Sequence, residues 1–461
     1  MSVHKPLITF LSIITIGVIL NPFFGIDVLL IGIALLVVGH VFLQEKLLFA
    51  FLIARPILDI WRDVHVVQLQ NIDINMNAAL TGLFLVWAVY MLLQHAQSLK
   101  EIPGSILGSL VALCMAVSFF WSVSPVSTLI ETMKFVSVFV CFLLGFVSIQ
   151  KKKFTFQELA IATLAAAVIP LLLGLFQVFF QAGITTFDIR GRIFGTFAHP
   201  NIFAFFILSL IMIYFHYASV KKEALFVEHP TLTYVGYGVL FFLLLQTYTR
   251  AAWVGCVVFL LIMGALQFRR LLGFVLVGGM AGYVLLFPIN AFIEYITDYS
   301  LESIQVVSRI TSRNEDADSL LWRQELFQET IPLITARPLL GYGYGTFPLV
   351  WENSRNATHL FDDSAEAHND YLRLGLEIGL VGLGLYILFL LFLFSRVMHI
   401  IWHKQKEKND VLFLAAWIGV FLVISISDNM LHHTPIMWLT WSWWGALFAS
   451  KYEYLPKGFL G

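Results

Sequence analysis

The sequence has few charged residues and very few cysteines. Only 12% of its 461 residues are Asp, Glu, Lys or Arg, whereas 59% are hydrophobic; soluble domains carry about 25% charged residues. The formal net charge of −1 argues against a nucleic-acid partner. Cys114, Cys141 and Cys256 all lie in apolar runs and are too few for a disulfide framework or a zinc site. The composition therefore predicts an all-α polytopic membrane protein with free thiols in its core.

Hydrophobic runs recur along the whole chain, and most approach the roughly 20 residues that a spanning helix needs. The first and third are short, so we expect about 12–14 transmembrane helices. Because both numbers are even, the two termini are expected on one side of the membrane. No small-residue cleavage site follows the first run, so no cleavable signal peptide is expected. The runs lie near 7–20, 28–43, 47–61, 76–93, 104–121, 126–149, 159–180, 202–217, 232–248, 251–266, 271–289, 371–401, 411–427 and 435–450.

Lysine and arginine cluster in four of the connections between these runs. The clusters are Lys151–Lys153, Lys221–Lys222, Arg269–Arg270 and the group Arg396, Lys404, Lys406 and Lys408. The predicted spans place all four on the face that also holds Lys5 and Lys457. Because cytoplasmic loops carry an excess of basic residues, this face and both termini are predicted to be cytoplasmic.

The opposite, outer face carries the longest connection of the chain, Asn290–His368. Connections of about 4–6 residues are usual, so this length favours a functional element. It contains an amphipathic helix pattern, "DSLLWRQELFQETIPLITA", and then a glycine-rich turn, "GYGYG". The other outer connections are 61–75, 181–201, 246–250 and 429–435. The chain is thus predicted to have three parts, which are N-terminal transmembrane helices (1–289), a large periplasmic loop (290–368) and C-terminal transmembrane helices (369–461).

Arginine recurs on the outer face, where few basic residues are expected. A guanidinium has a planar fork of donors that matches phosphate oxygens, so a bound anion is one explanation. For most of these arginines we favour the alternative, which is snorkelling to lipid headgroups or pairing with loop carboxylates. Arg192 and Arg250 each lie beside a predicted helix end, and for these two we favour phosphate binding. The outer arginines are Arg190, Arg192, Arg250, Arg313, Arg323, Arg337 and Arg355.

Two histidines stand where predicted helices begin on the outer face. His199 lies in "HPN", with Pro200 suited to an early helical position, and His368 lies in "HNDY". Helix N-termini attract anions, and a neutral imidazole is the usual general base. Each histidine could instead be a cap bonded to loop backbone. The sequence leaves these two interpretations open.

Other charged residues point less clearly to function. Glu131 and Lys134, three residues apart, are predicted to form a structural ion pair. Arg55 inside "LLFAFLIARPILDIW" indicates either a functional charge or a re-entrant segment. The carboxylates between Asp362 and Asp370 could hold a divalent cation, but they lack EF-hand spacing, so no metal site is predicted.

Four segments in order resemble the superfamily of O-antigen ligases and O-antigen polymerases, which are bacterial membrane proteins of glycan assembly. They are "RGRIFGTFAHPN", "TYTRAAWVG", "LWRQELFQETIPLITARPLLGYGYGTF" and "AHNDYLRLGLEIGLVGLGLYI". Together they extend from Arg190 to Tyr386, with the large outer loop between the second and the fourth. The first 180 residues match only as generic spans.

This resemblance implies the membrane fold of the C-type glycosyltransferases. The implied donor is a glycan on undecaprenyl diphosphate, presented at the periplasmic face of the bacterial inner membrane. The implied transfer to a hydroxyl proceeds with inversion, without a metal or another cofactor. The family's essential arginines and loop histidine correspond to Arg192, Arg250 and His368, the expected catalytic residues. Thr249 stands before Arg250 where many relatives have serine, a mild departure.

The residues fit this chemistry. Arginines would stabilise the departing diphosphate, and His368 would accept the proton of the acceptor hydroxyl, oriented by Asp370 or Glu366. We expect the substrate to contact His199, Asn201, Arg323, Glu366, Asn369, Asp370 and Tyr371.

Three functions remain open. A polymerase that extends a glycan by repeat units is favoured over a ligase that transfers the finished glycan to lipid A-core or to protein. A transporter or flippase for lipid-linked sugars is less favoured, because transporters place ionisable residues near the midplane and show inverted repeats. The expected partners are the lipid-linked donor, a glycan or lipid A-core acceptor, and membrane lipids.

Overall fold

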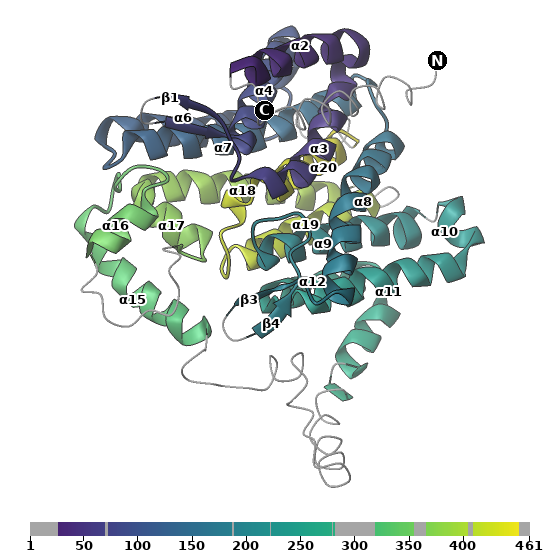
Figure 1. Ribbon diagram of the computed structural model, residues 1–461. Helices are drawn as coiled ribbons and strands as arrows, with labels where there is room; N and C mark the ends of the chain where they lie inside the picture. Colours follow the sequence, from purple (N-terminus) through teal and green to yellow (C-terminus); the bar gives the residue numbers. More distant parts are fainter. Residues whose placement is uncertain are drawn as a thin grey trace.

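The structure, a computed structural model, describes residues 26–69, 72–186, 189–221, 223–278, 280–281, 319–354, 366–403 and 409–450. The described residues are mostly helical, as the composition predicts (Figure 1). Their strands form two antiparallel hairpins, β1 (His65–Leu69) with β2 (Ile72–Asn75) and β3 (Ile184–Thr186) with β4 (Ile189–Arg192). The predicted run 7–20 and the end of the run 271–289 lie outside the described residues. Outside them too lie Arg313, Arg355, Asp362 and Asp363, and the lysines Lys5, Lys222, Lys404, Lys406, Lys408 and Lys457 of the predicted basic face.

The helices follow the predicted runs closely. Those of the first part are α2 (Ile26–Leu43), η2 (Gln44–Lys46), α3 (Leu47–Leu58), η3 (Asp59–Trp61), α4 (Met76–Gln94), α5 (Ala96–Leu99), α6 (Ser105–Val117), η4 (Ser118–Trp121), α7 (Pro125–Gln150) and α8 (Phe156–Phe179). Those of the second part are α9 (Pro200–Phe215), η5 (His216–Lys221), α10 (Ala224–Glu228), α11 (Pro230–Gln246), α12 (Arg250–Leu266), α15 (Ser319–Ala336), α16 (Phe347–Ser354), α17 (Asp370–Glu377), α18 (Gly379–His403), α19 (Asn409–Ile424), η9 (Met430–His432) and α20 (Thr434–Ala449).

Several helices are long and apolar enough to cross a membrane. Among the described residues there are six such segments, Gly32–Trp61, Met76–Gln94, Pro125–Gln150, Phe156–Phe179, Pro200–Lys221 and Gly379–Trp402. Shorter apolar helices accompany them, at Ser105–Trp121, Pro230–Gln246, Arg250–Leu266 and Asn409–Ile424. The chain is therefore an all-α polytopic membrane protein. The runs predicted at 28–43 and 47–61 are joined in one segment, which turns at Gln44, where φ is +48°.

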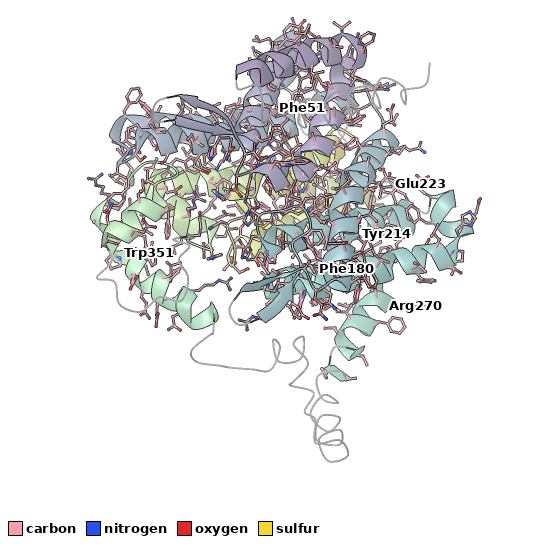
Figure 2. The ribbon with its side chains drawn as sticks, in the orientation of Figure 1. Phe51, Phe180, Tyr214, Glu223, Arg270 and Trp351 are labelled. Atoms are coloured by element: carbon pink, nitrogen blue, oxygen red, sulfur yellow. The ribbon has the colours of Figure 1, made fainter. Side chains whose placement is uncertain are left out.

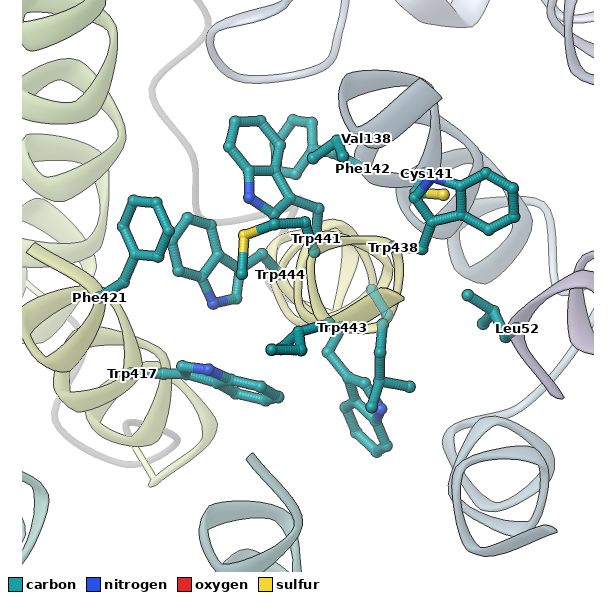
Figure 3. Packing of buried hydrophobic residues seen from close by; sticks show 14 of the residues in the cluster. Leu52, Val138, Cys141, Phe142, Trp417, Phe421, Trp438, Trp441, Trp443 and Trp444 are labelled. Atoms are coloured by element: carbon teal, nitrogen blue, oxygen red, sulfur yellow. The ribbon is translucent and has the colours of Figure 1, made fainter. Parts of the chain in front are cut away.

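Helix α20 forms the centre of the core. Every one of its 16 residues is buried, and Figure 3 shows four of its tryptophans among side chains of neighbouring helices. Helices α20 and α7 touch backbone to backbone, since a Cβ on Gly445 would lie 2.0 Å from the carbonyl oxygen of Phe142. Small residues allow such close approach between helices. Near its start α7 also contacts the residues before α20, through Glu131 and His432, so the two helices begin at the same end of the molecule.

Lys153 and Lys221, from two of the four predicted basic clusters, lie at one end of the helices together with Lys46. Lys46 pairs with Glu158 at 2.6 Å, and Lys153 pairs with Glu45 at 2.8 Å. Lys221, which closes the helical segment begun by α9, pairs with Asp410 at the start of α19. We call this end the basic end. In Figure 2, Glu223 lies near it, whereas Trp351 of α16 lies on the other side of the molecule.

The run predicted as one helix over 371–401 is in fact two helices, α17 and α18. At the break Gly379 has φ +66°, and a Cβ there would lie 2.2 Å from the carbonyl oxygen of Leu339. The amide of Leu380 donates to the carbonyl oxygen of Pro338 at 2.7 Å. The segment after α15 therefore docks against the break. This long-range contact explains why the local pattern gave one continuous helix.

Candidate functional site

Described parts of four connections predicted on one face, 181–201, 246–250, 290–368 and 429–435, meet at the end of the molecule opposite the basic end. The segment between α19 and α20 lies between α15–α17 on one side and β3–β4 on the other (Figure 1). Hydrogen bonds join these connections and their flanks, from Arg192 Nε to Thr247 O (2.9 Å), from Asn201 Nδ2 to Asp428 Oδ2 (2.9 Å) and from Asn429 Nδ2 to Glu366 Oε2 (2.9 Å). Thr196 Oγ1 also donates to Pro56 O of α3 at 2.6 Å. A polar centre thus forms from residues far apart in the sequence.

Arg192 ends β4 and is 2% exposed. Its Nε donates to Thr247 O, and its Nη2 donates to Asn201 Oδ1 at 3.0 Å and to Thr249 Oγ1 at 3.2 Å. A buried guanidinium held by several acceptors has a fixed direction. Arg192 therefore adds a positive charge of fixed position to the polar centre, and it also ties β4 to the start of α12.

Arg250 is the first residue of α12 and is partly buried. The preceding Thr249 also donates from Oγ1 to Asn201 Oδ1 at 3.2 Å, so Arg250 directly follows a residue of the polar centre. The N-terminus of a helix of this length carries partial positive charge and free N–H groups. Arg250 and this helix end together form a region that favours an anion. Arg323 of α15 lies near enough to Asp428 to help lower the pKa of that carboxyl.

His199 caps the N-terminus of α9, as one of the two interpretations expects. Its Nδ1 accepts a hydrogen bond from the amide of Asn201 at 3.1 Å, which requires that this nitrogen is unprotonated. Burial, and next the charge of Arg192, lower the pKa of His199 to about 4. His199 is therefore neutral at neutral pH. It does not add a third positive charge beside the two arginines.

The His199→Asn substitution is expected to reduce the loss of stability at mildly acidic pH. The pKa of His199 is lowered on folding from 6.5 to about 4, so its contribution is present above about pH 6.5 and is lost as pH falls towards 4. Asparagine is also a good N-cap and does not titrate. The melting temperature of the purified protein should fall less between pH 7.5 and 5 in the variant than in the wild type. Equal slopes for the variant and the wild type would contradict the assignment.

His368 lies two residues before α17 and has φ +44°, in the left-handed region that non-glycine residues rarely adopt. Its Nδ1 lies 3.9 Å from Asp428 Oδ1, and its side chain is 17% exposed. The expected orienting carboxylates were Asp370 and Glu366. The structure places Asp428, which follows α19, beside the ring, and Glu366 is also close enough to interact electrostatically with His368. Strained backbone of this kind is typical of functional sites.

Asp428 contacts more than one histidine and asparagine of the polar centre. His433 Nε2 lies 3.0 Å from Asp428 Oδ1, the amide of Asn429 donates to the same oxygen at 2.8 Å, and Asn201 binds the other oxygen. Burial alone would raise the pKa of Asp428, but His433 and His368 hold it well below its usual range. Asp428 is therefore ionised at neutral pH and fixes the imidazoles around it.

The residues after His368 direct their polar atoms into the protein. Asn369 caps α17 by accepting from the amide of Leu372 at 2.9 Å. Asp370 is 1% exposed and accepts from the amide of Leu431 at 3.2 Å, while burial raises its pKa to about 7. Tyr371 donates its hydroxyl to Leu422 O at 3.1 Å. These three residues, which we expected to contact substrate, attach His368 to the end of α19 and to the segment that follows it.

A second group of charged side chains adjoins Asp428. Arg373 and Glu377 of α17 lie one helical turn apart and form a buried ion pair at 3.0 Å, and Arg373 also reaches Glu131 and Glu366. Glu131 pairs with Lys134 as predicted, and it also contacts His432. The sequence motifs did not point to Arg373, Glu377, Asp428, His432 or His433. Ionisable residues at the edge of an apolar run, and the "DNMLHH" stretch in a predicted outer connection, were the available signals.

Arg55 has a structural explanation. It lies in α3, is 4% exposed, donates to Asp59 at 3.0 Å and donates to Thr434 Oγ1 at 2.7 Å. The hydrogen bond from Arg55 to Thr434 ties α3 to the start of the central helix α20. Within the described part of the chain, no group of three or more His, Cys, Asp or Glu side chains is placed to hold a metal ion.

The fold and this polar centre define a polytopic membrane protein with a candidate active site at one end of its helices. Residues 235–387 match the family model described as O-antigen ligase. The predicted resemblance to the O-antigen ligase and polymerase superfamily is thereby confirmed. The match includes Arg250, Arg323 and His368, whereas Arg192 and His199 precede it. A search of curated proteins finds no match.

Proposed function

We propose that the protein transfers a glycan from undecaprenyl diphosphate to an acceptor hydroxyl at the periplasmic face of the bacterial inner membrane. The transfer is inverting and metal-independent, and it joins repeat units into a polysaccharide. The observation that carries this proposal is the series of contacts from Arg192 through Asn201 to Asp428 and His368, with Arg250 following Thr249 at the adjoining start of α12. Glycan transfer from a lipid diphosphate needs a cationic site for the diphosphate and a base for the acceptor.

The arginines bind the diphosphate. Arg250 presents its donor fork at the start of α12, where the helix end adds positive potential. Arg192, held by Thr247, Asn201 and Thr249, adds a fixed charge behind it. A diphosphate is already a good leaving group, so catalysis requires stabilisation of its developing charge and correct positioning.

His368 serves as the general base. The acceptor oxygen attacks the anomeric carbon, and the bond from that carbon to the diphosphate oxygen breaks, leaving its electron pair on the diphosphate. The proton of the acceptor hydroxyl passes to the ring nitrogen of His368 that does not face Asp428. Asp428, which is a positioning residue, orients the ring and stabilises the imidazolium that forms.

A ligase that transfers a finished glycan to lipid A-core is the second candidate. The description of the matching family favours it. Both reactions use the same donor and the same chemistry, so they differ in the acceptor and in the length of the glycan transferred. Product analysis with a single lipid-linked substrate separates them.

The proposed orientation predicts the labelling of cysteines placed at the two ends of the molecule. Ser354→Cys in α16 should react with a membrane-impermeant thiol reagent in cells with a permeabilised outer membrane. Lys153→Cys, at the basic end, should react only after lysis. The background replaces Cys114, Cys141 and Cys256 with alanine. The reverse labelling pattern would place the site in the cytoplasm and contradict the proposed function.

A further inference from the structure

A group of polar residues beside the proposed base has an arrangement that the transfer mechanism does not use. His432 of η9 places Nδ1 3.2 Å from Glu131 Oε2, and its Nε2 lies 3.9 Å from Glu366 Oε1. Arg373 lies behind them, 3.9 Å from Glu131 and 3.6 Å from Glu366. We call Glu131, Glu366 and His432 the carboxylate–histidine group. Its members come from α7, from the segment before α17 and from η9.

The glycine-rich segment "GYGYG" supports this group from behind. Glu377 is fully buried, and its Oε1 accepts from the amide of Phe347 at 3.1 Å while it pairs with Arg373. Gly345 has φ +79°, and a Cβ there would lie 2.4 Å from Glu131 Cγ. The glycine therefore leaves the space that Glu131 occupies. Supporting contacts of this kind hold a binding site in one geometry.

Two members of the carboxylate–histidine group are partly exposed, whereas Glu131 and the supporting residues are more buried. The side chains of His432 and Glu366 are 31% and 27% exposed, whereas those of Arg373 and Glu377 are 6% and 0% exposed. The separation of 3.9 Å between His432 Nε2 and Glu366 Oε1 exceeds hydrogen-bond length. Both atoms can therefore accept hydrogen bonds from a ligand.

The chemistry of the group selects the ligand. When His432 donates Nδ1–H to Glu131, its Nε2 becomes an acceptor beside a carboxylate oxygen. Two hydroxyls on neighbouring carbons of a sugar ring present two O–H donors side by side and match this pair. Among the described residues, the three carboxylates Glu131, Glu366 and Glu377 pair with two cations, Arg373 and Lys134, so a diphosphate is disfavoured here. The group suits an uncharged polyol.

Two adjacent residues connect this group to the proposed base. Asp428 lies beside His368, and Asn429 donates from Nδ2 to Glu366 Oε2 at 2.9 Å. We propose that Glu131, Glu366 and His432 bind the sugar that carries the acceptor hydroxyl, beside His368 and apart from the diphosphate site. This inference rests on the proposed function and adds to it the position and the polyol nature of the acceptor.

The test compares His432→Asn and Glu366→Gln with His95→Asn, which alters a histidine near a carboxylate at the basic end. The acceptor probe is the glycolipid extract of a strain from which the gene of this protein has been deleted. The donor-site probe is undecaprenyl diphosphate without glycan. Because each substitution removes a hydrogen bond to a charged or imidazole group, the half-saturating concentration of the extract should rise about tenfold. The saturated rate should stay within about threefold, and thermal stabilisation by undecaprenyl diphosphate should be unchanged.

The control should match the wild type in all three measurements. An unchanged half-saturating concentration in a variant with the wild-type melting temperature would overturn the inference. Lost stabilisation by undecaprenyl diphosphate would also overturn it, because the group would then serve the donor. If Glu366→Gln unfolds, His432→Asn and His432→Gln decide the outcome. Absence of transfer by the wild type would instead refute the proposed function.

Discussion

Arg250→Lys is expected to lower glycan transfer by about 10–100-fold while the protein remains folded and inserted. Lysine keeps the positive charge, but its ammonium cannot donate two parallel hydrogen bonds to a phosphate. A lost hydrogen bond between charged groups costs about 1.5–3 kcal/mol, which corresponds to this range of rates. The measurement is the amount of glycan product formed in a deletion strain that carries the variant at wild-type expression.

Arg270→Lys is the matched control, because this arginine lies in one of the predicted basic connections and is exposed (Figure 2). It should give wild-type product. Full product with lysine at position 250 would show that Arg250 serves as an interfacial charge only. The donor diphosphate would then need a different site.

His368→Ala is expected to lower the single-turnover rate at saturating donor by about 10²–10⁴-fold, the usual contribution of a general base. Donor binding, followed by thermal stabilisation with undecaprenyl diphosphate, should be almost unchanged, because the base acts in the transition state. His199→Ala should show the opposite pattern and weaken donor binding first, since His199 caps α9 beside Arg192 and Asn201. A normal rate for His368→Ala would require another base.

Asp428→Asn tests how Asp428 acts. If it works through His368, the rate of the double variant His368→Ala/Asp428→Asn should equal that of His368→Ala alone. If the double variant instead loses rate by the product of the two single reductions, Asp428 acts separately from His368, for example through Asn201 and Arg192.

The sequence predicted the helices and the ends at which polar residues gather. The length of apolar runs and the clustering of basic residues between them are local signals. Run length placed most of the described helices correctly, and Lys153 and Lys221 of the predicted clusters lie at one end of the molecule. The starts of α9 at Pro200 and of α17 at Asp370 were predicted from capping patterns and were confirmed. The break between α17 and α18 was missed, because it results from contact with the segment after α15.

The candidate site was predicted only in part. Arg192, Asn201 and His368 stood out because they follow the family motifs, and the structure brings them to one polar centre. The role of Asp428 could not be predicted, because its neighbours His368 and Asn201 are distant in the sequence. Glu131 was interpreted as half of a local ion pair, since only the fold places His432 and Arg373 beside it.

The central claim is transfer from a lipid diphosphate without a metal, and it is tested most directly with purified protein and one substrate. The protein is reconstituted in lipid with an undecaprenyl-diphosphate-linked repeat unit as the only glycan, in the presence of EDTA. Products are separated by the number of repeats. The wild type should form glycans of two or more repeats on the lipid diphosphate, and His368→Ala should form none. Activity that EDTA abolishes and magnesium or manganese restores would contradict the account, as would a failure to consume the donor even when lipid A-core is added.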